Sequence, residues 1–140
     1  MKTHSIFVSA LSALVGSLIA NIALLLIFAP FTGMVNFPPL SVSGVTIFTV
    51  AGVLGAAIVY AIVLRFSTNP TRLFTWISAV VLVLSFLPDI FFRQLAAGGE
   101  NTTSSAIVLL MAFHVACAVI TVWALTRLTA PRVPAIPRIS

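Results

Sequence analysis

The chain has 140 residues, of which 61% are hydrophobic and only 6% are charged. Soluble domains carry roughly 25% charged residues, so this composition excludes an ordinary water-soluble protein and makes lipid part of the solvent. The net charge of +5 does not indicate nucleic-acid binding, because the basic residues stand singly at the ends of apolar runs and not on one exposed face.

Four apolar runs of about 20 residues follow each other along the chain, and each is long enough for a helix to cross the hydrocarbon core of a bilayer. The runs do not alternate between polar and apolar residues as the strands of a membrane barrel do. The predicted fold is all-α, an integral membrane four-helix transmembrane bundle in residues 1–129 with a flexible cytoplasmic tail in residues 130–140. The predicted helices cover residues 6–28, 45–64, 73–92 and 106–125.

The segments between these runs contain residues that typically start or end helices. Pro30 ends the first helix, and Asn69-Pro70 is typical of an N-cap followed by proline at the first helical position. Residues 101–105 offer several caps for the fourth helix. The uncharged connection over residues 30–43 has two interpretations: a segment lying on the membrane surface, or a lid over a cavity between the helices.

The positions of the basic residues predict the orientation. Arg65 and Arg72 flank the second connection, Arg127 follows the fourth helix, and Lys2 precedes the first. With an even number of crossings these residues lie on one side of the membrane. Positive charge is retained in the cytoplasm, so both termini are expected there.

Small residues predict where the helices pack. Helices in lipid associate through close backbone approach and van der Waals contact, which small side chains permit. We expect helix packing at Ser12, Gly16 and Ala20 of the first helix and at Gly52, Gly55 and Ala56 of the second. The short connection from Arg65 to Arg72 predicts that the second and third helices are antiparallel neighbours.

Three polar residues on three helices lie at similar depth within the membrane: Asp89, His114 and Asn21. A carboxylate in a transmembrane segment costs on the order of 2–4 kcal/mol near the bilayer centre, so it usually faces the bundle and has a partner. The three side chains are either hydrogen-bonding groups that specify packing, or a ligand or proton site, since histidine can change charge near neutral pH. Together with Cys117 they lack the paired spacing of a zinc site, so we predict no metal and no cofactor.

Several short stretches resemble a family of small bacterial four-helix membrane proteins of unknown function. They are Arg65-Phe66 with Pro70 and Arg72-Leu73-Phe74, the run from Leu82 to Pro88-Asp89, Met111-Ala112-Phe113-His114, and Leu125-Thr126-Arg127. The resemblance covers about two thirds of the chain. It implies a multi-pass protein of the bacterial cytoplasmic (inner) membrane and implies nothing about activity.

Three hypotheses for function remain open. The first is a non-catalytic membrane subunit or self-associating bundle. The second is a carrier or sensor of a small apolar ligand or protons that uses Asp89 and His114, and the third is a membrane-embedded enzyme acting on a lipid-like substrate, although no catalytic motif is found. The expected partners are the lipid bilayer and other membrane protein chains or further copies of this one. An open cavity that reaches Asp89 and His114 would favour the second or third hypothesis, and a closed pair would favour the first.

Overall fold

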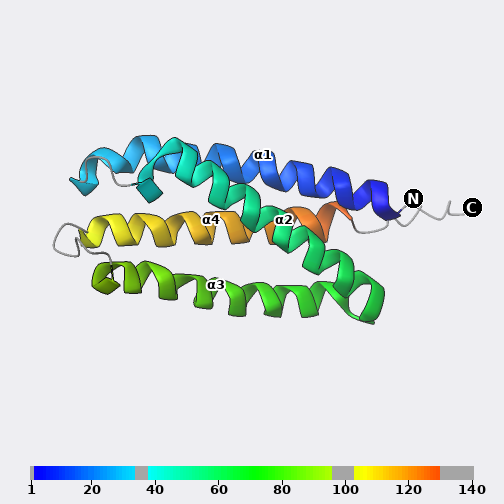
Figure 1. Cartoon of the computed structure of the whole chain (residues 1–140). Helices are drawn as coiled ribbons and strands as arrows, with labels where there is room; N and C mark the ends of the chain where they lie inside the picture. The colour runs from blue at the N-terminus through cyan, green and yellow to red at the C-terminus, as the bar shows by residue number, and fades with distance from the viewer. Residues whose placement is uncertain (1, 34–37, 96–102, 130–140) are drawn as a thin grey trace, which may run out of the picture.

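The protein consists of long helices joined by short connections (Figure 1). The structure is a computed structural model that describes residues 2–33, 38–95 and 103–129, with side chains for residues 5–33, 38–91 and 103–129. The four long helices in this part of the chain are apolar enough to cross a membrane, which confirms the predicted all-α fold. The predicted tail, residues 130–140, lies outside the described residues. The helices are α1 Lys2–Phe28, α2 Val42–Phe66, α3 Pro70–Leu95 and α4 Ser104–Leu128, and two 3-10 helices, η1 Ala29–Thr32 and η2 Pro38–Leu40, connect α1 to α2.

Polar residues just outside the apolar runs set the starts of three helices. The Oγ atom of Ser41 accepts from the backbone N–H of Gly44 at 3.0 Å, and Thr103 caps α4 in the same way. As predicted, α3 begins at Pro70 directly after Asn69, where the absence of a proline N–H costs nothing. Because each cap lies ahead of the apolar run, these three helices begin two or three residues earlier than hydropathy alone predicts.

Hydrogen bonds between helix ends show which ends lie together. The Ser5 hydroxyl donates to the carbonyl oxygen of Leu128 at 3.4 Å, so α1 begins beside the end of α4. The hydroxyls of Tyr60 and Thr129 lie 3.1 Å apart at this same end, which we call the termini end. At the opposite end, called the far end, the Thr103 hydroxyl donates to the carbonyl oxygen of Thr32 at 2.8 Å. Figure 1 shows all helices running between these two ends.

The helices do not pack as a symmetric bundle. α1 makes its most extensive contacts with α4 and then with α2, whereas α3 packs mainly on α4. α2 crosses the bundle diagonally, lying beside α1 at the far end and joining α3 at the termini end (Figure 1). The predicted antiparallel contact of α2 with α3 is therefore found near their connection, where the ring centroids of Tyr60 and Phe74 lie 4.7 Å apart.

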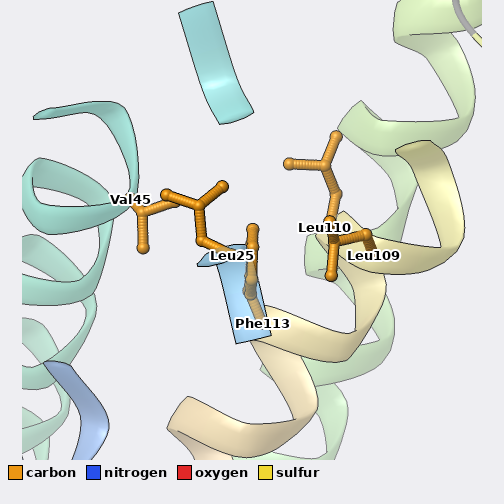
Figure 2. Packing of buried hydrophobic residues seen from close by; sticks show 5 residues of the cluster. All are labelled: Leu25, Val45, Leu109, Leu110 and Phe113. Atoms are coloured by element: carbon orange, nitrogen blue, oxygen red, sulfur yellow. The ribbon is translucent and has the colours of Figure 1, made fainter. Parts of the chain in front are cut away.

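A buried apolar cluster joins α1, α2 and α4 at the far end. Figure 2 shows its five side chains converging from these helices; they are Leu25, Val45, Leu109, Leu110 and Phe113. Leu40 of η2 packs against this cluster, while Phe31 of η1 is exposed. The connection between α1 and α2 thus contacts the core through one of its large apolar residues and presents another outward.

The predicted packing face of α1 needs correction. Its buried residues recur every four positions and form one helical stripe; they are Ser9, Ala13, Ser17, Asn21 and Leu25. Ser12 was expected on this face, but it is exposed, and its hydroxyl donates to the carbonyl oxygen of Val8. Gly16 and Ala20 are half-buried at the edge of the stripe. The buried face is rotated from the predicted one because serine and alanine at the contact also let α4 approach closely.

The α2 glycines, which were predicted to pack against other helices, make few contacts within one chain. A Cβ atom built on Gly55 would meet nothing within 4 Å, and one on Gly52 would meet only Cys117 Sγ, at 3.9 Å. Both glycines are exposed, because α2 leaves α3 at this level instead of packing against it. Ala56, by contrast, packs against the cluster that contains Tyr60 and Phe74.

Candidate functional site

A cavity of about 660 Å³ lies between α2, α3 and α4. This volume falls within the range of roughly 300–1,000 Å³ that is typical of small-molecule sites. Small residues on the α2 wall make room for it, because Gly52 and Gly55 leave the space beside α3 unfilled. α2 diverges from α3 toward the far end (Figure 1).

The cavity is open along its side. Phe48 on one wall and Val81 on the other have side chains that are 69% and 57% exposed. Both residues belong to candidate membrane spans, so this exposed part of the lining lies within stretches that are apolar enough to cross a bilayer.

The carboxyl, imidazole and amide side chains of the lining lie toward the far end of the cavity, whereas the portion nearer the termini end is mostly apolar and includes the hydroxyl residues Ser78 and Thr121. Asn21, Thr49 and Asp89 each lie about two turns or less from the far end of their helix, and His114 lies nearly three turns from it. Phe74 lines the cavity near the termini end. Along α3, Phe74 and Asp89 are separated by roughly 22 Å at 1.5 Å per residue. The cavity is thus elongated, with its carboxyl and imidazole groups toward one end and a long, mostly apolar portion toward the other.

The structure brings two of the three predicted polar residues into contact. The Nδ1 atom of His114 lies 3.3 Å from Oδ2 of Asp89. The same Nδ1 atom lies 2.9 Å from the carbonyl oxygen of Leu110, and because a carbonyl oxygen can only accept, Nδ1 carries a proton and donates to it. The contact with Asp89 is electrostatic and lacks hydrogen-bond geometry.

Asp89 and Asn21 each line the cavity with a buried side-chain oxygen that has no hydrogen-bond partner among the described residues, and Asp89 is the acidic one of the two. It is only 5% exposed, and its Oδ2 atom has no hydrogen-bond partner among the described residues. Pro88 precedes it within α3, so the helix has no proline N–H to donate to the carbonyl of Leu84. A buried carboxylate oxygen without a donor is costly. Asp89 can therefore accept a hydrogen bond from a molecule in the cavity that it lines.

Asn21, the third predicted residue, has a different partner. Its side chain is 2% exposed, and Nδ2 donates to Oγ1 of Thr49 at 2.9 Å. Asn21 and Thr49 both line the cavity, but this bond ties α1 to α2 and does not involve Asp89 or His114. Sequence reasoning missed Thr49. The available signal was a hydroxyl residue inside an apolar run at the depth of Asn21.

The arginines that predict the orientation lie apart from the cavity. Arg65, Arg72 and Arg127 are exposed at the termini end, where Trp76 and Trp123 also present their indole rings outward. In the described part of the chain, no group of three His, Cys, Asp or Glu side chains is placed to hold a metal ion.

Comparison with known proteins assigns a family. A family model matches residues 2–131. The chain belongs to the family of unknown function DUF6069. This membership confirms the resemblance to a family of unknown function, and the match covers all four helices of the DUF6069 chain. No curated protein and no solved structure matches it.

Proposed function

We propose that the protein binds a small lipophilic molecule from the bilayer and acts as its carrier or sensor. The observation that supports this function is an open intramembrane cavity that reaches a buried carboxyl group with an unpartnered oxygen. If Asp89 and His114 served only to hold α3 on α4, a closed and hydrogen-bonded pair would be expected. Instead both line the cavity, and Oδ2 of Asp89 is left without a donor.

We further propose that both termini are cytoplasmic and that the protein resides in a bacterial inner membrane. The support is the grouping of exposed Arg65, Arg72 and Arg127 at the termini end, since short cytoplasmic segments are enriched in basic residues. In this orientation the polar end of the cavity lies in the outer half of the bilayer. The apolar portion then extends toward the cytoplasmic side.

A second candidate function is that of a non-catalytic subunit or a self-associating bundle. The exposed small residues of α2, Gly52 and Gly55, favour it, because small residues also let a helix of another chain approach closely. The two functions compete for the same lateral opening. A partner helix in the cavity would exclude the ligand.

The test is to fill the cavity with a side chain. A Cβ atom at Gly55 would have no other atom of the chain within 4 Å. The variant Gly55→Leu should therefore fold, with its side chain occupying the ligand's space. Parent and variant are extracted from the membrane in native nanodiscs, and bound molecules are identified by mass spectrometry. A lipophilic molecule enriched over bulk lipid in the parent and lost in Gly55→Leu supports binding. The same molecules on both proteins, or none enriched on either, would refute it.

A control separates cavity filling from a general effect of leucine on α2. Ala61 is exposed on the same helix and does not line the cavity, so Ala61→Leu should retain the ligand. If the parent instead carries a second protein chain that Gly55→Leu releases and Ala61→Leu retains, the subunit function is correct and the ligand function is wrong.

A further inference from the structure

We infer that the ligand is a single-chain amphiphile with a cationic head that donates hydrogen bonds, and that it binds with this head at Asp89 and its chain directed toward Phe74. This inference rests on the proposed function and specifies the chemistry of its ligand. It follows from three features of the cavity: the atoms that need partners, the charges that surround them, and the distribution of polar residues along its length.

The unpartnered atom determines the hydrogen-bonding role of the head. Oδ2 of Asp89 is a buried acceptor without a donor, and the nearest ring nitrogen, Nδ1 of His114, already donates to the carbonyl oxygen of Leu110. A head group that only accepts would leave Oδ2 as it is. A head group that donates satisfies it, and an ammonium offers up to three N–H donors.

The charges in the cavity determine the sign of the head. Among the described residues that line it, none is lysine or arginine, and Asp89 is the only acid. An anionic head would therefore meet a like charge in a medium where such repulsion is strong. A cationic head forms a charge-assisted hydrogen bond with the carboxylate.

The distribution of polar residues determines the orientation. Asp89, His114, Asn21 and Thr49 lie toward the far end, whereas Ile77 and Val122, with the hydroxyl residues Ser78 and Thr121, line the portion nearer Phe74 and include no acidic, basic or amide side chain. This mostly apolar portion suits a hydrocarbon chain lying roughly parallel to the helices. Because the exposed part of the lining lies within candidate membrane spans, such a molecule enters from the bilayer without leaving the orientation it has there.

Photo-crosslinking of the full chain in phosphatidylcholine nanodiscs tests the orientation. Two dodecylamine probes are used, one with a diazirine next to the amine and one with a diazirine at the end of the chain. We expect the first to label peptides around Asp89 and His114, and the second to label peptides around Phe74 and Val122. Reversed or identical labelling patterns would overturn the inferred orientation.

Competition against the same probes tests the chemistry of the head. Unlabelled dodecylamine, dodecanol and dodecanoate differ only in the head group. At neutral pH the amine should compete about tenfold or more better than the carboxylate, with the alcohol between them. In Asp89→Asn the advantage of the amine over the alcohol should disappear. In Thr75→Val, which removes an exposed hydroxyl of α3 outside the cavity, the advantage should persist.

The outcomes separate this inference from the proposed function. If the probes label the cavity and Gly55→Leu blocks labelling, but the three competitors are equal or the carboxylate is best, the inference is wrong and the binding function stands. If the probes do not label the cavity of the parent above the level of Gly55→Leu, both are wrong. Circular dichroism and the melting temperature of Asp89→Asn establish that its altered preference is not a loss of fold.

Discussion

The ring of Tyr60 lies 4.7 Å from the ring of Phe74, centroid to centroid and inclined by 54°, and at this contact α2 and α3 begin to diverge. Phe74 is fully buried and also lines the cavity. The Tyr60 hydroxyl lies 3.1 Å from that of Thr129 after α4. The pair thus joins three helices at the termini end and closes the apolar end of the cavity.

Replacing Phe74 by alanine should destabilise the protein and lengthen the cavity. The cost should be roughly 1–3 kcal/mol, below the about 3–5 kcal/mol of phenylalanine truncation in soluble cores, because lipid also solvates the apolar groups exposed on unfolding. The measurement is the melting temperature in nanodiscs. Tyr60→Phe, which keeps the ring contact and removes one hydroxyl, serves as control and should cost about 0.6 kcal/mol. Equal melting of parent and Phe74→Ala would contradict this role.

The glycines of α1 and α2 should respond oppositely to leucine. A Cβ on Gly16 would lie 3.2 Å from Cγ2 of Ile120, so Gly16→Leu forces α1 from α4 and should destabilise by about 1–3 kcal/mol. Gly55→Leu enters open space and removes a glycine from a helix interior, which should leave the melting temperature equal or higher. Similar losses in both variants would show that the space beside Gly55 is filled in the membrane.

The hydrogen bond between Asn21 and Thr49 should be measurable as a coupling between α1 and α2. A double-mutant cycle with Asn21→Ala and Thr49→Val removes each partner separately and then both. We expect a coupling energy of about 0.6–1.7 kcal/mol, the range observed for hydrogen bonds between membrane helices. Strictly additive losses of stability would mean that the two side chains do not interact.

Asp89→Asn and His114→Gln should both fold as well as the parent. The contact between the two residues lacks hydrogen-bond geometry, so removing the charge of either side chain should lower the stability little. In addition, burying a neutral amide costs less free energy than burying a carboxylate. Melting temperatures within about 2 °C of the parent, a loss of a few tenths of a kcal/mol, are expected. A large loss in either variant would indicate that the pair is structural.

The proposed orientation predicts opposite labelling of two exposed positions. In a Cys117→Ala background, Ser43→Cys lies at the far end and Thr68→Cys between α2 and α3 at the termini end. A membrane-impermeant maleimide added to intact cells should label Ser43→Cys. It should label Thr68→Cys only after permeabilisation. The reverse pattern would place both termini outside.

Much of the fold follows from the sequence because a bilayer has a fixed thickness. Each crossing needs about 20 apolar residues, so the four helices and their approximate bounds could be predicted. The same regular rise per residue places Asp89 and His114 at similar depth on α3 and α4. Their proximity was therefore predictable from helix counting and from the cost of exposing a carboxylate to lipid.

The rotation of each helix was decided only by the tertiary structure. The helices are apolar on nearly all sides, and most lipid-facing and protein-facing residues are chemically alike, so hydropathy does not identify the buried face. Ser12 was expected inside and is exposed, whereas Ser9 and Ser17 are buried. The cavity was equally hidden, since it arises where α2 diverges from α3 beside Gly52 and Gly55. That divergence depends on contacts between distant segments, including Asn21 with Thr49 and Tyr60 with Phe74, which no local pattern in the chain encodes.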